Sequence, residues 1–252
     1  MRVGIFDSGV GGITVLKAAK KLLPNVDYIY YSDNNHVPYG TKTKEEVLGY
    51  VKEIAALLVK EEVDAIVIAC NTATSIAASQ LRETYPIPII GMEPAVKLAF
   101  DNHKEGDILV TATALTLKEA KFNSLVKSLG EQKRVQKLAL PELVEYAEKL
   151  NFDKDILFPY FKKKFEEIDM DSISAVVLGC THFVYFKDIL EEYLPKHIKI
   201  YDGNEGTIRH LKDVLGDSPS MHIKKVPQTE FYYSGKKCES NNILDTYLRV
   251  LK

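Results

Sequence analysis

Cysteine is scarce in this sequence, and the spacing of the few that occur excludes two common uses. The chain has 252 residues and three cysteines, Cys70, Cys180 and Cys238. They are too few and too far apart for a disulfide framework. The Cys-x-x-Cys spacing that zinc sites favour is also absent. In a reducing compartment, each cysteine is therefore a free thiol, a metal ligand or a catalytic group.

Neither an excess of one charge nor a long apolar run occurs. The chain carries 33 basic and 35 acidic residues, with no basic block or basic-aromatic interleaving, so we expect no nucleic-acid surface. No stretch approaches the roughly 18 to 20 apolar residues that a membrane span requires, and the first residues lack the apolar segment of a signal peptide. The sequence predicts a cytoplasmic protein without a membrane partner, which binds small molecules or copies of itself.

Cofactor-binding motifs are missing too, although "DSGVGG" at 7–12 is rich in glycine, as nucleotide-binding loops are. Its glycines do not make G-x-G-x-x-G, because Thr14 occupies the last place, and no lysine completes a P-loop. Two interpretations remain open. The backbone NH groups and Ser8 bind an anion such as a carboxylate, while Asp7 acts as a base or binds an amine. Alternatively, the segment is a tight turn in which Asp7 caps the next helix.

Short apolar runs alternate with helical patterns along the chain. Apolar residues at spacings of four and three predict a helix over 44–60, and "TKEE" at 43–46 is a capping box at its start. Alternating strands and helices predict parallel sheets covered by helices on both faces. The other predicted helices cover 13–23, 74–84 and 240–251, and the predicted strands cover 2–6, 28–32, 64–70, 87–91, 107–112, 175–180, 198–203 and 230–235.

The sequence contains an internal duplication. "AIVIAC" at 65–70 and "AVVLGC" at 175–180 are 110 residues apart, and the same shift aligns "IPIIGMEP" at 87–94 with "HIKIYDGN" at 197–204. A similar shift aligns "VGIFDSG" with "DILVTAT". Two copies of one unit predict two pseudo-symmetric, doubly wound parallel-sheet domains of ordinary size.

We expect the first domain to comprise residues 1–95 with 207–252, and the second to comprise 96–206. Ligands of doubly wound sheets bind beyond the carboxyl ends of the strands. Cys70 and Cys180 both stand at such ends. The two thiols are therefore predicted to face one cleft between the domains.

Each of these two cysteines is followed at once by hydrogen-bonding residues at an expected helix N-terminus. These residues are Asn71 and Thr72 after Cys70, and Thr181 and His182 after Cys180. A helix N-terminus lowers the pKa of a thiol and makes it reactive. Three readings remain open for the pair: buried core residues, a zinc site completed by His182, or a catalytic pair in which His182 is either a proton partner or a structural residue.

Two thiols on opposite sides of a small substrate suit a two-base reaction. One thiolate removes a proton from carbon while the other thiol delivers a proton to the opposite face, which inverts the centre. The carbanion needs fixed donors, which Asn71, Thr72 and Thr181 could supply. This chemistry is racemisation or epimerisation without a cofactor.

Two further segments could line such a cleft. "PYGTK" at 38–42 is typical of a turn that exposes Tyr39 and Gly40. "TATALT" at 111–116 offers three threonine hydroxyls, at 111, 113 and 116, to a substrate carboxylate. Threonine is also an ordinary helix N-cap, so this segment has a structural interpretation as well.

At this point the motifs resemble those of the glutamate racemases, in the aspartate/glutamate racemase superfamily. The matching stretches are "GIFDSGVGG", "VPYGTK", "CNTAT", "EP" at 93 and 94, "TATALT" and "GCTHF". The resemblance implies pseudo-symmetric two-domain α/β proteins, often homodimeric, that convert L-glutamate to D-glutamate for peptidoglycan. It also implies that neither pyridoxal phosphate nor a metal is used.

The resemblance further implies a role for each matched residue. Cys70 and Cys180 match the catalytic cysteines, and Asp7 and His182 match residues that assist them and also contact the substrate. The remaining predicted substrate contacts are Ser8, Tyr39, Gly40, Asn71, Thr72, Thr113, Thr116 and Thr181.

The sequence departs from the family pattern in two places. In "LPELVEYAE", Glu145 stands where proline is usual and Glu148 stands at the acidic place, so either glutamate could be the assisting carboxylate. Glu119 replaces a common serine. The alternative functions are racemisation of aspartate or another amino acid, a zinc site, and amino-acid binding without catalysis.

Overall fold

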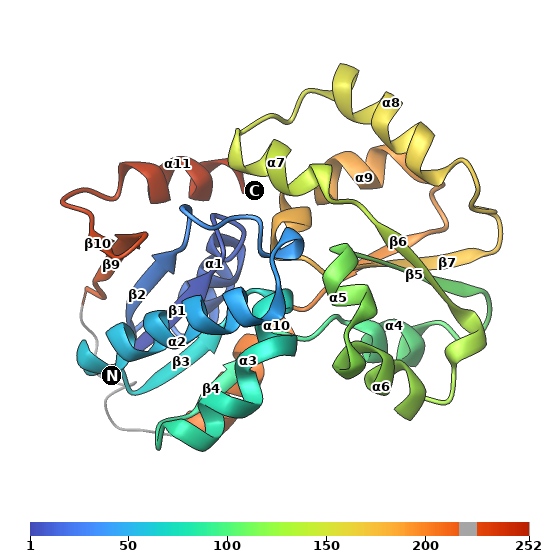
Figure 1. Ribbon diagram of the computed structural model, residues 1–252. Coiled ribbons are helices and arrows are strands. Elements are labelled where there is room, and N and C mark those ends of the chain that lie inside the picture. Colours follow the sequence, from blue (N-terminus) through green and yellow to red (C-terminus); the bar gives the residue numbers. More distant parts are fainter. Residues whose placement is uncertain (217–225, 252) are drawn as a thin grey trace.

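The computed structural model of the chain describes residues 1–216 and 226–251. Positions 217–225 and 252, which belong to the predicted first domain, lie outside the described residues. Helices and mostly parallel strands form two lobes that lie side by side, each built on its own sheet (Figure 1). This arrangement confirms the predicted α/β fold with parallel sheets.

The first lobe contains a six-stranded sheet in the order β10-β9-β2-β1-β3-β4. Its strands pair in parallel, except for the short antiparallel pair of β9 and β10. The strands are β1 (Arg2–Asp7), β2 (Asp27–Ser32), β3 (Ala65–Ile68), β4 (Ile89–Gly91), β9 (Thr229–Tyr233) and β10 (Lys236–Lys237). The helices beside it are α1 (Ile13–Leu22), η1 (Tyr39–Thr41), α2 (Lys44–Lys60), α3 (Asn71–Thr84), α10 (Asn204–Leu215) and α11 (Asn242–Val250).

The second lobe contains a four-stranded parallel sheet in the order β6-β5-β7-β8. The strands are β5 (Asp107–Ala112), β6 (Val135–Ala139), β7 (Ile173–Leu178) and β8 (Lys199–Asp202). The helices are α4 (Val96–Asn102), α5 (Ala114–Lys118), α6 (Ala120–Ser128), η2 (Gln132–Arg134), α7 (Glu142–Glu148), α8 (Lys154–Phe165), η3 (Thr181–Phe186) and α9 (Lys187–Tyr193).

The two sheets share one topology. The order β2-β1-β3-β4 in the first sheet corresponds to β6-β5-β7-β8 in the second, and Ala65 of β3 and Ala175 of β7 are 110 residues apart. This correspondence agrees with the duplication read from the sequence. The proposed domain division remains a prediction, and its limit at 206 lies inside α10, which packs against α1.

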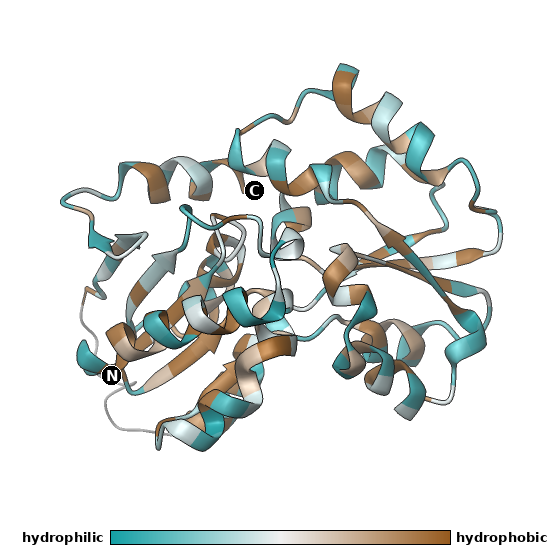
Figure 2. Cartoon of the chain, viewed as in Figure 1, coloured by the Kyte–Doolittle hydropathy of each residue, from teal (hydrophilic) through white to brown (hydrophobic). Residues whose placement is uncertain are grey.

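The hydrophobic core is built in layers. One cluster lies between the sheets and joins α1, α10 and α11 to α7, α8 and α9. The outer face of the first sheet is covered by α2 and α3, and that of the second by α4 and α6. Figure 2 shows hydrophobic strands inside and mixed helices outside. Strand β3 is buried at every position, as expected for a central parallel strand covered on both faces.

Several predicted limits differ from the structure. Helix α3 begins at Asn71 rather than 74, directly after Cys70, because the Cys70 sulfur accepts a hydrogen bond from Ala73 N and so caps the helix. Cys180 precedes a 3-10 helix, η3, rather than an α-helix. Strand β6 was not predicted, since it is an edge strand whose Gln136 and Lys137 give it no continuous apolar run.

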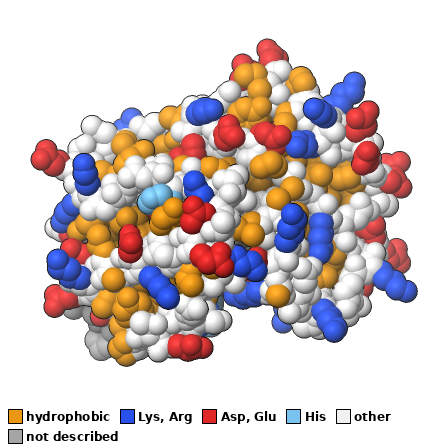
Figure 3. Space-filling view, viewed as in Figure 1, with side chains coloured by type: hydrophobic (Ala, Val, Ile, Leu, Met, Phe, Trp, Pro, Cys, Tyr) orange, Lys and Arg blue, Asp and Glu red, His pale blue; other side chains and the backbone are white. Residues whose placement is uncertain are grey.

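The surface contains no separate face of one charge in the view that Figure 3 shows. Basic and acidic side chains are intermixed there, and hydrophobic side chains are scattered between them. In the described part of the chain, none of the helices combines the length and apolar character that crossing a membrane requires.

Helix α2 has the limits predicted from its capping box, and this box offers a test of stability. The Thr43 hydroxyl accepts from Glu46 N at 3.2 Å, while the Glu46 carboxylate accepts from Thr43 N at 2.8 Å. We expect Thr43→Ala to lower the free energy of unfolding by about 1 kcal/mol, measured by denaturant titration.

Thr246→Ala is the matched control. The Thr246 hydroxyl bonds back to Asn242 O within α11, on an exposed part of the helix. We expect this change to stay within about 0.5 kcal/mol. Equal losses in the two variants would contradict the role of the capping box.

Candidate active site

A small cavity lies between the lobes, at the carboxyl ends of β1, β3 and β7. Its volume of about 10 Å³ is room for about one water molecule. A small organic substrate can therefore enter only if the walls move apart. The predicted residues that line it are Ser8, Tyr39, Gly40, Cys70, Asn71, Thr72, Thr113, Cys180, Thr181 and His182. The other three, Asp7, Thr116 and Glu148, bind lining residues from behind.

Cys70 lies at the end of β3, where the first-lobe loop 7–12 meets helix α3. Its Sγ is 3.8 Å from Ser8 Oγ and 3.5 Å from Ala73 N. Burial raises the pKa of the Cys70 thiol to about 12, and the nearby charge of Asp7 adds to the shift. The helix N-terminus lowers this pKa only in part, so the predicted net lowering is wrong for Cys70: the thiol holds its proton.

Cys180 occupies the matching place after β7 and lies beside an imidazole. Its Sγ is 3.9 Å from His182 Nδ1, and His182 Nε2 is 2.7 Å from Glu148 Oε1. Burial alone lowers the pKa of His182, but the hydrogen bonds and charges of Cys180 and Glu148 outweigh it and raise the pKa well above its usual value. His182 is therefore a protonated donor to both neighbours.

Asp7 is fully buried beside the cavity and is held by both lobes. Its carboxylate accepts from Gly9 N at 3.0 Å and from Thr181 Oγ1 at 3.0 Å. Burial raises its pKa, and the charge of His182 with these two hydrogen bonds offsets part of the rise. Gly12, not Asp7, is the N-cap of α1. The helix-cap interpretation of Asp7 is therefore wrong.

The glycine-rich loop 7–12 binds carboxylates of the protein itself. Val10 N donates to Glu148 Oε1 at 2.8 Å, just as Gly9 N donates to Asp7. These NH groups are already used, so a substrate anion must find other donors. A Cβ atom at Gly11 would lie 2.4 Å from both His182 Nδ1 and Thr181 Oγ1, so glycine there allows the loop to pack against η3.

The structure distinguishes the two candidate glutamates at the end of α7. Glu148 contacts His182, and its side chain is 15% exposed. The side chain of Glu145 is 62% exposed and pairs with Lys149 at 3.6 Å. Glu148 is therefore the carboxylate that belongs to this site.

Threonine hydroxyls join the lobes on the other side of the cavity. Thr72 Oγ1 lies 3.1 Å from Thr113 Oγ1 and 3.0 Å from Thr116 Oγ1. Thr111, by contrast, donates to Val177 O within the second sheet and is structural. Asn71 Oδ1 is buried and has no hydrogen-bond partner among residues 1–216 and 226–251, which leaves a carbonyl oxygen for a ligand.

Tyr39 and Gly40 form the wall contributed by the turn at 38–42, and the predicted exposure of Tyr39 is wrong, because its ring is buried in this wall. The Tyr39 hydroxyl donates to Asp33 Oδ2 at 2.6 Å, and burial together with Asp33 raises its pKa. A Cβ atom at Gly40 would lie 2.8 Å from Thr113 Cβ, so this glycine lets the turn touch the second lobe.

Sequence reasoning missed Asp33 and assigned no role to Glu119. Asp33 follows β2 directly, so the rule that chemistry lies at strand ends could have found it. Glu119 is buried and pairs with Lys44 of the first lobe at 3.0 Å. The replacement of the usual serine thus makes an ion pair between the lobes.

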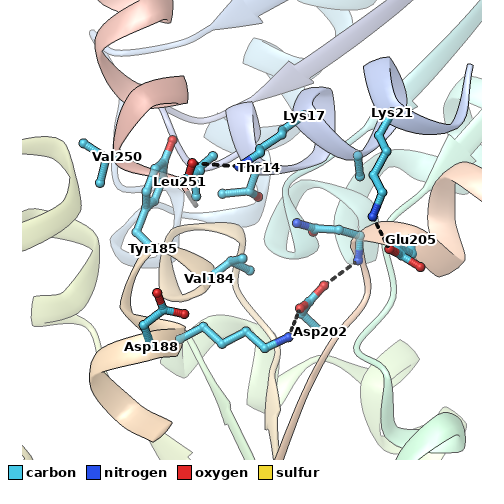
Figure 4. A pocket seen from close by; sticks show the side chains of 13 residues that line it. Thr14, Lys17, Lys21, Val184, Tyr185, Asp188, Asp202, Glu205, Val250 and Leu251 are labelled. Atoms are coloured by element: carbon cyan, nitrogen blue, oxygen red, sulfur yellow. Dashed lines mark hydrogen bonds and ion pairs between the residues drawn. The ribbon is translucent and has the colours of Figure 1, made fainter. Parts of the chain in front are cut away.

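A second, larger cavity of about 250 Å³ lies between α1, α9, α10 and the end of α11 (Figure 4). Charged side chains bridge it: Lys187 pairs with Asp202 at 3.1 Å, and Lys21 pairs with Glu205 at 3.7 Å. Lys17 Nζ also donates to Leu251 O at 2.7 Å. Each of these contacts lies within one lobe: the first within the second lobe, and the other two within the first.

A zinc site was one alternative for Cys70, Cys180 and His182. Among the residues that the structure describes, no group of three or more His, Cys, Asp or Glu side chains is arranged to hold a metal ion. His182 Nε2 is bound to Glu148. The zinc alternative therefore lacks a ligand set in this part of the chain.

Comparison with known proteins agrees with this geometry. A family model described as Asp/Glu/hydantoin racemase matches residues 14–211. The chain belongs to this family. Glutamate racemase from Halothermothrix orenii is 51% identical, over 100% of this chain and 99% of that one. Glutamate racemase from Campylobacter curvus is 45% identical, over 100% and 96%.

Solved structures give the same result. Glutamate racemase from Campylobacter jejuni subsp. jejuni superposes with a TM-score of 0.86 at 28% identity, covering 100% of both chains. The Escherichia coli enzyme, in complex with L-glutamate and the activator UDP-MurNAc-ala, has a TM-score of 0.83 at 28% identity and covers 99% of this chain and 94% of that one. These matches confirm the resemblance to the glutamate racemases, which are isomerases.

The raised pKa of Cys70 predicts how this thiol reacts. A thiol with a pKa of about 12 is almost wholly protonated at pH 8, unlike a free cysteine of pKa about 8.5. We expect the alkylation rate of Cys70 by iodoacetamide to keep rising up to pH 10.5 without levelling. Mass spectrometry of the Cys70 peptide measures the rate, with the half-buried Cys238 as internal comparison.

Asp7→Asn tests the cause of this shift. Removing the Asp7 charge removes one contribution that raises the pKa of Cys70, so the alkylation profile of Cys70 should move to lower pH while that of Cys238 stays in place. A Cys70 profile that levels near pH 9 in the unchanged protein would contradict the pKa assigned to it.

Proposed function

We propose that this chain interconverts L-glutamate and D-glutamate without a cofactor, with Cys70 and Cys180 as its two acid-base groups. The observation that carries the proposal is the matched placement of two thiols, at equivalent strand ends of two duplicated sheets, in the wall of one cavity. The glutamate racemase names of relatives at 40–51% identity support the substrate.

The reaction moves one proton on each face of the α-carbon. One sulfur, as thiolate, takes the α-proton, and the other thiol gives its proton to the opposite face, so the centre inverts and the thiols exchange roles. Cys70 holds its proton in the protein alone. The substrate ammonium next to Asp7 offsets the charge that raises the pKa of Cys70, which favours its thiolate when substrate is bound.

The remaining groups bind and polarise the substrate. Asn71 Oδ1 accepts from the substrate ammonium, because it is a buried acceptor with no partner among the described residues. The hydroxyls of Ser8 and Thr72 donate to its carboxylates and to the oxygens that gain charge in the transition state. The Thr181 hydroxyl donates to Asp7 and so holds that carboxylate in place. On the Cys180 side, the His182–Glu148 pair supplies a fixed donor to the sulfur.

Glutamate is favoured over aspartate as the substrate. Aspartate racemase from Picrophilus torridus has a TM-score of 0.56 at 17% identity, a likeness that shows the fold alone. We further propose that the D-glutamate is used for peptidoglycan. The homodimer and the cytoplasmic location implied by the resemblance remain predictions.

The proposal is tested by racemisation in deuterated water without added cofactor. We expect solvent deuterium at the α-carbon of L- and D-glutamate, with no loss in the presence of chelator. Cys70→Ser and Cys180→Ser should each lower turnover at least about 100-fold, since a positioned acid-base group contributes about 10² to 10⁴. Nuclear magnetic resonance of the α-proton measures the exchange.

Cys238→Ser is the matched control, because Cys238 lies outside the cavity lining, and it should keep full turnover. Full activity in either variant of Cys70 or Cys180 contradicts the two-thiol mechanism. Exchange with aspartate but not glutamate would favour the aspartate alternative, and binding without exchange would favour a binding protein.

The contrast between Glu148 and Glu145 provides a second test. Glu148→Gln removes a charge that raises the pKa of His182, so we expect turnover to fall about tenfold and its alkaline limb to move to lower pH as His182 loses its proton earlier. Glu145→Gln should stay within about twofold. Steady-state pH profiles of turnover measure both effects. Equal effects of the two changes would contradict the assignment of Glu148 to the site.

A further inference from the structure

The carboxylate of Glu148 is held by three donors from different parts of the chain. Oε1 accepts from Val10 N at 2.8 Å and lies 2.7 Å from His182 Nε2. Oε2 accepts from Asn34 Nδ2 at 2.8 Å. Asn34 follows β2 in the first lobe, whereas Glu148 ends α7 of the second. The loop after β2 thus reaches the second lobe and binds the carboxylate that contacts His182.

The amide of Asn34 is itself oriented. Ser32, fully buried at the end of β2, donates through Oγ to Asn34 Oδ1. The Glu148 carboxylate needs a donor, so Nδ2 faces Glu148 and the amide oxygen faces Ser32, whose hydroxyl donates to it. A carboxylate only accepts hydrogen bonds, so this orientation satisfies both partners. Rotating the amide by half a turn would place an oxygen against a carboxylate oxygen.

We propose that Asn34 is a positioning residue for the Cys180 half of the reaction, because it fixes the carboxylate that orients His182 toward Cys180. The inference rests on the two-thiol function proposed above. Without Nδ2, Oε2 of Glu148 loses its protein donor. The carboxylate is then free to rotate, so that Oε1 moves away from Val10 N and His182 Nε2. His182 Nδ1 then no longer stays directed at Cys180 Sγ, and the transfer of a proton to or from that sulfur slows.

Asn34→Ala provides the first test. We expect turnover to fall about tenfold, in keeping with the loss of a hydrogen bond to a charged group. The α-deuterium isotope effect should rise for the enantiomer whose proton goes to Cys180, because that step becomes rate-limiting. It should fall toward one for the other enantiomer. The Cys180→Ser variant identifies which enantiomer is which.

Asn35→Ala is the matched control. Asn35 is the exposed neighbour of Asn34, and its backbone NH donates to Ser234 Oγ, a bond that alanine retains. We expect unchanged turnover and isotope effects. If Asn34→Ala behaves like Asn35→Ala, or lowers turnover with unchanged isotope effects for both enantiomers, the positioning role is wrong and Asn34 is merely structural.

Asn34→Asp provides an independent test in case Asn34→Ala weakens folding. Aspartate has the shape of asparagine and can still accept from Ser32, but it places a second carboxylate against Glu148. Two close carboxylates raise the pKa of one of them. At lower pH the shared proton restores a donor between them. The ratio of Asn34→Asp turnover to that of the unchanged protein should therefore rise as pH falls, while the ratio for Asn34→Ala stays level.

Other titratable groups do not disturb this comparison. Those whose charges interact with Glu148 are His182, Asp7, Tyr30, Tyr185, Tyr233 and Tyr247. All six are the same in both variants. A level ratio for Asn34→Asp would overturn the proposal. Full turnover in Cys180→Ser would instead overturn the two-thiol function, so the two failures are distinguishable.

Discussion

The buried contact between His182 and Glu148 is the interaction on which the rest of this site depends. Both groups are charged and lie between the lobes, where an unpaired charge is costly. Glu148 therefore needs every donor that surrounds it: Val10 N, Asn34 and His182. Two of these donors come from the first lobe. The same contact that orients His182 toward Cys180 thus also ties α7 to the loops after β1 and β2.

The two thiols stand at equivalent places in a duplicated fold, yet their surroundings differ. Cys70 caps an α-helix and faces Asp7, so burial and a negative neighbour keep its proton in place. Cys180 precedes a 3-10 helix and faces a protonated imidazole. In the proposed reaction one sulfur must give a proton while the other takes one. The different neighbours of the two sulfurs therefore suit a reaction in which the sulfurs have opposite roles.

Much of this could be read from the sequence, and the failures have physical reasons. The strand ends at Cys70 and Cys180 could be predicted, because the apolar runs that form the strands and the similarity of the two runs are both visible in the sequence. The choice between Glu148 and Glu145 could not be predicted, because it depends on which side of α7 faces η3. The pKa of Cys70 was predicted in the wrong direction, since a helix N-terminus is visible in sequence but the depth of burial is not.

Asn34 was not predicted to belong to the site, for a related reason. An asparagine after a strand is typical of a turn, and nothing local reveals that its amide reaches a glutamate 114 positions away. The residues that decide this site are those that touch the opposite lobe: Asn34 with Glu148, Asp7 with Thr181, and Thr72 with Thr113. The cavity they surround has room for about one water, so in the proposed reaction the lobes must move apart to admit glutamate. In that proposed reaction, these hydrogen bonds between the lobes both position the groups around the thiols and oppose opening. Admission of the substrate and restoration of the arrangement around the thiols are therefore linked steps.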